Sequence, residues 1–354
     1  MLNVTHFQRR PAPGQVSIER VFAQVRGALP NHIRSSVHLS PRLSRGILPR
    51  LANLVDAAHC RGELNHIVGD VHYLALAVPA CRTMLTIHDC VSLERLRGLK
   101  RSLFRWLWYV LPLRQAALVS VVSESTKREL LDQVPCDPSK IRVIHNCVGN
   151  EFLPFCRPFN KTNPVILQVG TSMNKNLDRV GTALSGIRCT LKIIGPLSCP
   201  QRRMLQDRRI SFVNRAQVCN SELVQAYRDA DLVIFASTYE GFGLPILEAN
   251  ATGRPAITSQ IFSMPEVAGA AACFVDPYDV RSIRTGLLRV LTDDRYRRHL
   301  VAAGFENVKR FTPANIASQY ADAYEEILGH PRPARPLKSS ALRPAIALPA
   351  GSLS

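Results

Sequence analysis

The sequence predicts an α/β protein with two doubly wound domains, each built on a mostly parallel sheet covered by helices. Short runs rich in β-branched residues alternate with helical patterns, as is typical of βαβ units buried on both faces. Seven such runs occur, at residues 83–88, 117–123, 141–145, 165–170, 191–195, 232–237 and 255–258. With 354 residues and 46% hydrophobic content, the chain exceeds one typical domain, so we expect two.

The strand and helix pattern breaks between about residues 149 and 164, where prolines lie among Asn and Gly residues. We therefore expect an N-terminal domain over residues 1–158 and a C-terminal domain over residues 159–312. A last helix is expected over residues 313–330. Residues 331–354 are basic and rich in Pro without any acidic residue, a composition that predicts disorder.

Polar residues mark two helix starts. Thr126-x-x-Glu129 predicts a capping box after the run 117–123. Ser221 precedes an amphipathic pattern and predicts a second start. Each of these strands is therefore expected to lead into a helix.

The chain is strongly basic, with 45 Lys and Arg residues against 27 Asp and Glu residues and a net charge of +18. Such a surplus attracts phosphorylated ligands, nucleic acid or anionic lipid surfaces, and it does not choose among them. The sequence contains no recognisable nucleic-acid-binding domain and no basic stretch interleaved with aromatic residues. We therefore expect no nucleic-acid partner.

The ten cysteines include no C-x-x-C pair, which predicts reduced and mostly buried thiols. The N-terminus lacks the continuous apolar segment of a signal peptide, so we expect a cytoplasmic protein. Residues 103–122 are apolar but contain Arg105 and Arg114, so we expect them not to span a membrane. We interpret this stretch as a packed helix followed by a buried strand. The alternative is a surface helix that docks on a membrane through its aromatic residues.

The densest chemical signal lies in residues 231–248. A buried strand, 232–237, runs into a loop with Glu240 and two glycines, and Pro245 opens a helix, where its missing N–H costs nothing. In open α/β sheets ligands bind at the carboxyl ends of strands, and a helix N-terminus suits a phosphate. The carboxylates of Glu240 and Glu248 suit sugar hydroxyls instead, as acceptors of charge-assisted hydrogen bonds.

This stretch, Glu240-Gly241-Phe242-Gly243-Leu244-Pro245-Ile246-Leu247-Glu248, resembles the E-x7-E signature of retaining GT-B glycosyltransferases, specifically the family 4 group. The resemblance covers nearly the whole chain and includes residues 17–20, 66–70, 87–89, 169–171, 174–176 and 264–267. It implies two Rossmann-like domains that face each other across a cleft, with the last helix returning to the first domain. It also implies that Glu248 binds the donor ribose and that Glu240 contacts the donor sugar.

Lys175 follows a buried strand that ends in Gly170 and Thr171, within reach of the same crevice. An ammonium group there would offset the charge of a diphosphate leaving group. In the family a basic pair commonly does this, and the matching lysine is Lys175. Thr171 and Asn174 stand where many relatives have Arg, and Arg179 is the candidate for the second cation.

His88 also follows a strand. The resemblance implies that its side chain points at the donor sugar and acts as a hydrogen-bond donor or polariser rather than a general base. Gly195 and Asn214 fall in segments where relatives contact the base through main chain. The catalytic candidates are His88, Lys175 and Glu240. The expected nucleotide-sugar-binding residues are Gly170, Thr171, Lys175, Asn176, Gly195, Asn214, Gly241, Phe242, Gly243, Leu244, Pro245 and Glu248.

The resemblance implies a retaining, metal-independent hexosyltransferase, with a lean toward bacterial mannosyltransferases of surface-polysaccharide assembly. The expected partners are a nucleotide-diphosphate sugar and a saccharide or lipid-linked acceptor, with peripheral contact at the anionic inner face of the cytoplasmic membrane. We expect no metal, because Asp229-Ala230-Asp231 fits a turn from helix to strand and the resemblance implies metal independence, and we expect no cofactor. The alternatives are a nucleotide-sugar epimerase or hydrolase on the same fold, and a basic nucleic-acid-binding protein.

Overall fold

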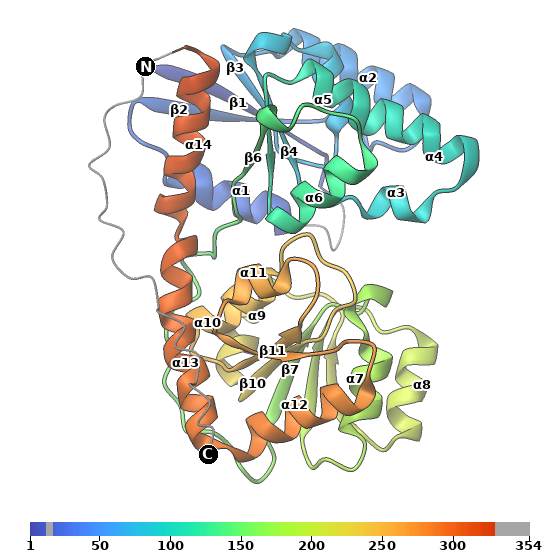
Figure 1. Cartoon of the computed structure of the whole chain (residues 1–354), viewed down its shortest axis with the longest axis vertical. Coiled ribbons are helices and arrows are strands. Elements are labelled where there is room, and N and C mark those ends of the chain that lie inside the picture. The colour runs from blue at the N-terminus through green and yellow to red at the C-terminus, as the bar shows by residue number, and fades with distance from the viewer. Residues whose placement is uncertain (12–16, 330–354) are drawn as a thin grey trace, which may run out of the picture.

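The computed structural model describes residues 1–11 and 17–329, which form two stacked halves, each with a six-stranded parallel sheet (Figure 1). The α/β, GT-B fold class predicted from the sequence is confirmed. The basic stretch 331–354, for which disorder was predicted, lies outside the described residues.

The first sheet has the strand order β2-β1-β3-β4-β5-β6. Its strands are β1 (Leu2–Gln8), β2 (Ile33–Leu39), β3 (Leu64–Ile67), β4 (Thr83–Ile87), β5 (Leu118–Val121) and β6 (Ile141–Val143). The chain runs outward from β1 to β2, then continues on the other side of β1 with β3. The winding direction therefore reverses between β1 and β3, and such a reversal places ligands at the carboxyl ends of the two strands.

The helices of this half cover both faces of its sheet (Figure 1). They are α1 (Ser17–Gly27), α2 (Ile47–His59), α3 (Val91–Arg95), α4 (Gly98–Arg105), α5 (Leu111–Gln115) and α6 (Glu124–Gln133). The shorter turns are η1 (His72–Ala77), η2 (Ala80–Arg82), the π-helical η3 (Trp106–Val110) and η4 (Pro138–Lys140). Residues 103–122 thus form helical segments followed by strand β5, as predicted. No helix among the described residues has both the length and the apolar content of a membrane span.

The second sheet has the order β12-β11-β10-β7-β8-β9. Its strands are β7 (Val165–Val169), β8 (Thr190–Ile194), β9 (Ser211–Arg215), β10 (Leu232–Phe235), β11 (Ala256–Ser259) and β12 (Ala272–Val275). Its helices are α7 (Leu177–Leu184), α8 (Cys199–Asp207), α9 (Asn220–Asp229), α10 (Leu244–Ala251), α11 (Met264–Ala268), α12 (Val280–Thr292) and α13 (Asp294–Val308), with turns η5 (Met173–Lys175) and η6 (Lys309–Phe311).

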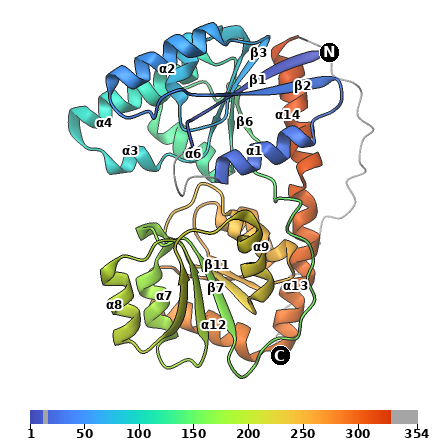
Figure 2. The same cartoon turned by 180° about the vertical axis from the view of Figure 1, so that it is seen from behind.

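The last helix, α14 (Pro313–Ile327), leaves the second half and packs against the first (Figures 1 and 2). Tyr320 and Tyr324 are fully buried there, in one cluster with Phe22 of α1. The Tyr324 hydroxyl lies 3.1 Å from His6 Nε2 on β1 and 2.8 Å from His66 Nδ1 on β3. Because buried polar side chains need hydrogen-bond partners, α14 completes the core of the first sheet.

Several details differ from the sequence prediction. All seven predicted runs contain strands, but β1, β2, β3, β9 and β12 were not predicted. Helix α6 is capped by Ser123, whose Oγ accepts a hydrogen bond from the Thr126 amide, so the capping box predicted at Thr126 is wrong. Helix α9 begins at Asn220 after Cys219, one residue before Ser221.

The prediction of mostly buried cysteines is also wrong, because five of the ten are exposed. All ten are free thiols. The exposed ones are Cys60, Cys81, Cys156, Cys199 and Cys219. Four of these five lie at or next to the ends of helices or helical turns, where the chain is at the surface.

Candidate active site

The winding direction of the second sheet reverses between its neighbouring strands β7 and β10. From β7 the chain continues to β8 and β9 on one side, and from β10 to β11 and β12 on the other. In doubly wound sheets this reversal point separates the loops and leaves room for a ligand. Lys175 follows β7 and Glu240 follows β10, so two of the three predicted catalytic residues lie at the reversal point.

Lys175 and Glu240 form an ion pair, with 2.7 Å between Lys175 Nζ and Glu240 Oε1. The same carboxylate oxygen accepts a hydrogen bond of 3.2 Å from the side-chain amide of Asn174. The two paired side chains are 19% and 15% exposed. The ammonium also lies 4.6 Å from the centre of the Phe235 ring. Two groups suited to a diphosphate and a sugar therefore neutralise each other in this structure.

Two glycines shape the backbone around this pair. Gly170 has φ +93°, and a Cβ there would lie 2.9 Å from Lys175 Cε, so the lysine stem crosses the space that a side chain would fill. Gly243 has φ +116° and immediately precedes α10. The amides of the first helical turn have no acceptor within the helix and carry the positive end of its dipole. The start of α10 is therefore suited to an anion.

The loop at Gly241 packs directly on the first domain. A Cβ at Gly241 would lie 1.9 Å from the carbonyl oxygen of His88, so only glycine fits there. The hydroxyls of Ser123 and Thr126 donate to the Gly241 carbonyl over 2.7 and 3.1 Å. The carboxyl ends of the two sheets therefore meet at this loop.

A second contact between the domains lies beside Gly241. The Tyr239 hydroxyl donates to the Glu129 carboxylate over 2.8 Å and accepts a hydrogen bond of 3.1 Å from the Cys90 amide. Glu129, which the sequence placed in a capping box, thus binds a residue of the other domain.

His88 is held neutral by its surroundings. Burial lowers the pKa of its imidazole to about 4, against an opposing effect of the Val68 carbonyl. Its Nε2 lies 3.0 Å from the Val68 carbonyl oxygen, which can only accept, so Nε2 carries the proton. The remaining nitrogen, Nδ1, is then an acceptor. The hydrogen-bond donor expected toward a sugar is directed into the protein instead.

Glu248 is buried on α10, with its side chain 4% exposed. Its Oε2 accepts a hydrogen bond of 2.6 Å from the Tyr227 hydroxyl, and its Oε1 accepts one from the guanidinium of Arg20 on α1. Burial raises the pKa of the Glu248 carboxyl, while Arg20 and Tyr227 oppose that shift. The predicted ribose ligand is therefore paired with a cation from the other domain.

Three other predicted site residues direct their side chains at main-chain carbonyls. The Thr171 hydroxyl donates to Pro196 O over 2.5 Å, and the Asn214 amide donates to Gly195 O over 2.7 Å. The Asn176 amide donates to Ala236 O and Pro277 O over 2.9 and 2.7 Å. Thr171 and Asn176 thus shape the loops around the reversal point, whereas Asn214 ties the edge strand β9 to the end of β8.

The Asp229-Ala230-Asp231 sequence forms the turn from helix to strand that was expected. Asp231 accepts hydrogen bonds from the amides of Val165 and Asn160 over 2.7 and 3.0 Å, which ties β10 to the segment before β7. Among the described residues, one group has a spacing that suits a metal, made of His38, Asp56 and Cys60 between β2 and α2. None of these three was a predicted site residue.

Two family descriptions match consecutive parts of the chain. Residues 4–152 match Glycosyltransferase Family 4, and residues 150–307 match Glycosyl transferases group 1. The junction falls between the two sheets.

The chain belongs to glycosyltransferase family 4. It is 40% identical to O-antigen chain mannosyltransferase B of Escherichia coli over 108 residues, which are 30% of this chain and 28% of that protein. It is 36% identical to the serotype-specific mannosyltransferase WbdA of Escherichia coli over 274 residues, 70% of this chain and 34% of that protein. The chain thus spans about a third of the length of these relatives.

A solved structure shares the fold over almost its whole length. Anabaena HepE in complex with UDP and glucose superimposes with a TM-score of 0.70 at 17% identity, over 91% of this chain and 99% of that one. At this identity the likeness concerns the fold.

The sequence prediction missed several contacts around the candidate site of this family 4 chain. It assigned Arg20 and Tyr227 to helices without a site role and Glu129 to a capping box, although Arg20 belongs to one of the matching segments. Their importance comes from partners far along the chain, Glu248 for the first two and Tyr239 for the third. The segment 17–20 carried the one signal that pointed to Arg20.

Proposed function

We propose that this chain is a retaining glycosyltransferase that moves a hexose, with mannose favoured, from a nucleotide-diphosphate sugar to a saccharide or lipid-linked saccharide acceptor. The observation that carries the proposal is the Lys175–Glu240 pair at the reversal point of the second sheet, beside the start of α10. A cation and a helix N-terminus suit the diphosphate, and a carboxylate suits the sugar hydroxyls.

In the proposed reaction the acceptor hydroxyl approaches the anomeric carbon on the face that the diphosphate leaves. The new bond joins the acceptor oxygen to the anomeric carbon, and the bond from that carbon to the phosphate oxygen breaks with its electron pair. The acceptor proton passes to the departing phosphate oxygen. Lys175 and the backbone N–H groups of residues 241–244 stabilise the charge that develops on the diphosphate.

The names of the relatives support the choice of substrate. Two relatives are mannosyltransferases, one of O-antigen chains, which favours mannose and a role in surface-polysaccharide biosynthesis. The structural neighbour HepE holds UDP and glucose, which supports a nucleotide-sugar donor. The proposed enzyme needs no metal, because Lys175 supplies a positive charge at the leaving group.

The test is to incubate the purified protein and a membrane lipid extract with labelled GDP-mannose, UDP-glucose, UDP-galactose and UDP-N-acetylglucosamine in turn, with and without EDTA. We expect labelled glycolipid or saccharide from one donor, above all GDP-mannose, with an unchanged rate in EDTA. Release of free sugar or an epimerised nucleotide sugar without any acceptor product would favour the hydrolase or epimerase alternative. Loss of transfer in EDTA would contradict metal independence.

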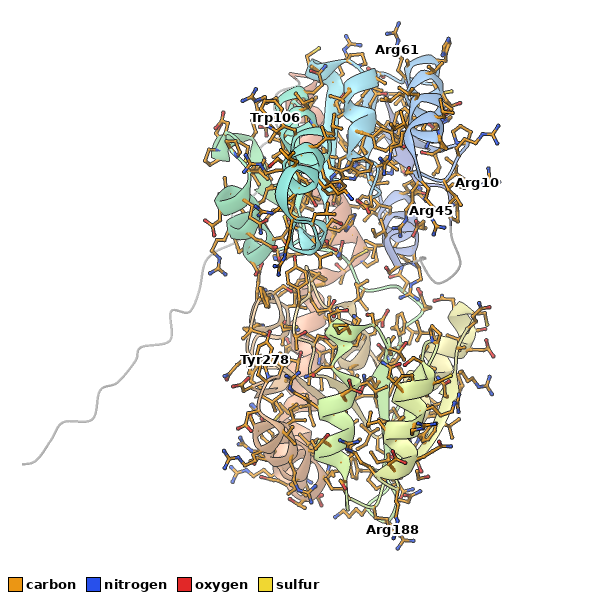
Figure 3. All side chains as sticks on the ribbon, turned by 90° about the vertical axis from the view of Figure 1, so that its right-hand side faces the viewer. Arg10, Arg45, Arg61, Trp106, Arg188 and Tyr278 are labelled. Carbon is orange, nitrogen blue, oxygen red and sulfur yellow. The ribbon has the colours of Figure 1, made fainter. Side chains whose placement is uncertain are left out.

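We also propose that the first domain contacts an anionic membrane through an apolar face on α2 and α4–η3. The large exposed side chains of this face are Ile47, Leu48, Leu51, Val55, Leu99, Leu103, Trp106 and Leu107. Leu99 is 90% exposed and Leu48 is 78% exposed. Figure 3 looks onto this side of the molecule and labels Trp106 and Arg45.

The charge around this apolar face favours a lipid surface as its partner. Residues 39–55 contain three Arg residues, residues 98–115 contain four basic residues, and neither stretch contains an acidic residue. The Arg50 guanidinium lies 4.6 Å from the centre of the Trp108 ring, so the two helical segments adjoin. Apolar side chains among basic ones suit the boundary of an anionic bilayer, whereas two copies of this face would repel each other.

Vesicle sedimentation tests this contact. The protein is expected to sediment with phosphatidylglycerol vesicles and much less with phosphatidylcholine vesicles, and Leu48→Glu with Leu99→Glu should lower the bound fraction at least about tenfold, because each carboxylate opposes insertion. Leu288→Glu is the control, since Leu288 is 41% exposed on α12 of the other domain. Equal binding of the double variant and the control would overturn the proposal.

A further inference from the structure

The ion pair between Arg20 and Glu248 joins the two domains. Arg20 lies on α1, which faces α9 across the boundary between the halves (Figure 2). One nitrogen of its guanidinium donates to Glu248 Oε1, and the other donates to Asn220 Oδ1 at the start of α9 over 2.9 Å. The guanidinium carbon lies 5.6 Å from the centre of the Phe152 ring, in the segment that joins the domains.

A hydrogen-bonded network holds Arg20 in this place. Glu151 accepts a hydrogen bond of 3.0 Å from Gln24 on α1 and one of 2.9 Å from Asn220 on α9. The joining segment therefore bridges both helices next to the ion pair. The Arg20 guanidinium is therefore held by Glu248 and Asn220 and lies over the Phe152 ring.

The polar and charged groups that face Glu248 have different effects on the ionisation of its carboxyl. Arg20 on α1 and Tyr227 on α9 stabilise the carboxylate, and Glu151 of the joining segment opposes it. Burial raises the pKa of the carboxyl more than any other factor. Arg20 and Tyr227 both stabilise the carboxylate, but only Arg20 carries a positive charge, and it belongs to the other domain.

The hydrogen bonds of the described residues leave acceptor positions on Glu248 unused. An ionised carboxylate has about four acceptor positions, and Arg20 and Tyr227 occupy one on each oxygen. One position on each oxygen therefore remains for the two hydroxyls of a ribose. A protonated carboxyl would lose one of these acceptors, so donor binding requires the ionised form.

We infer that Arg20 is a positioning residue of the donor site, which the first domain supplies to keep Glu248 ionised and correctly oriented for the ribose. This inference rests on the proposed function, in which Glu248 binds that ribose. It makes the nucleotide site of the second domain depend on the first domain. Separation of the domains would remove this cation from Glu248 and weaken nucleotide binding.

The test measures the dissociation constants of GDP and UDP for the full-length protein by calorimetry between pH 6 and pH 8.5. In Arg20→Met the pKa of Glu248 rises, so a larger fraction is protonated at low pH. The ratio of variant to wild-type dissociation constants should be about tenfold or more at pH 6, and should fall below about threefold at pH 8.5. The titration of the nucleotide's own phosphate cancels in this ratio.

Three variants separate positioning from simple structural damage. Arg20→Lys should restore most of the wild-type pH profile, because it keeps the charge. In a Glu248→Gln background, Arg20→Met should have little further effect on nucleotide affinity, since a neutral amide cannot be protonated. Arg142→Met removes an exposed ion pair with Glu326 elsewhere in the first domain and should leave nucleotide binding unchanged.

The outcomes distinguish this inference from the proposed function. If the wild-type protein binds neither GDP nor UDP, the proposed function itself fails. If the wild type binds a nucleotide and Arg20→Met weakens it by the same factor at every pH, or not at all, the role of Arg20 in ionising Glu248 is wrong. Thermal unfolding of each variant is measured as well, and a midpoint temperature close to that of the wild type is the criterion for a retained fold.

Discussion

Lys175→Ala is expected to lower the turnover of sugar transfer by about 100-fold to 1,000-fold, the range found when one preorganised group that stabilises a developing anion is removed. The substitution deletes the ammonium that lies beside the start of α10. Of Lys175 and Asn174, which both contact the Glu240 carboxylate, only the Asn174 side-chain amide then remains. Donor binding should change less than turnover, because the charge on the diphosphate grows as its bond to the sugar breaks. Steady-state and single-turnover rates with the active donor measure the effect.

Lys192→Ala is the matched control for Lys175→Ala. Lys192 lies on β8 of the same domain, is 19% exposed like Lys175, and pairs with Asp229 over 2.7 Å, the distance found in the Lys175–Glu240 pair. It lies away from the reversal point of the sheet. Its replacement should leave turnover within about threefold of wild type, since a partly exposed ion pair contributes little. Equal losses in both variants would show that Lys175 acts through stability and not at the leaving group.

Gly241→Ala is expected to lower transfer by about 100-fold, because a displacement of about 1 Å in an active site has an effect of this size. The added Cβ would lie 1.9 Å from the His88 carbonyl oxygen, and the contact is with backbone, which cannot rotate away. Either the loop moves from Ser123 and Thr126 or the two domains separate. The unfolding free energy should fall by about 1 to 3 kcal/mol, as in other overpacked sites, and urea unfolding measures this.

Gly27→Ala serves as the control for Gly241→Ala. Gly27 ends α1, and a Cβ at this position would have no neighbour within 4 Å. The same chemical change should therefore leave transfer at the wild-type rate. Full activity of Gly241→Ala would mean that the close contact between the loop and His88 is absent from the working enzyme.

The sequence predicted the second domain better than the first. Strands β7, β8, β10 and β11 are short runs rich in apolar, mostly buried residues, and their residues alone identify them. The edge strand β9 alternates between exposed and half-buried residues and was not recognised. Lys175 and Glu240 were found because a residue that follows a strand lies at the carboxyl edge of the sheet, wherever the neighbouring strands lie.

In the first domain, β1 and β3 were missed although both lie inside the sheet. They contain polar residues that local patterns assign to the surface, such as His6, Asn65 and His66. In the structure these residues are fully buried. Burial is possible because Tyr324, on the last helix, supplies a hydroxyl to both histidines. That partner lies about 260 residues or more along the chain, so no local pattern contains it.

In the active site too, some features depend on nearby residues of the sequence and others on partners that are distant along the chain. The sequence by itself determined the glycine loop, the helix that begins after it, and the two charged residues that follow neighbouring strands, because backbone conformation and strand ends depend on nearby residues. Only the tertiary structure decided that Glu248 receives its counter-charge from Arg20 and that Gly241 packs on His88. These features arise where the two domains meet, and the ionisation of a buried carboxylate depends on which charge lies beside it in space rather than in the sequence.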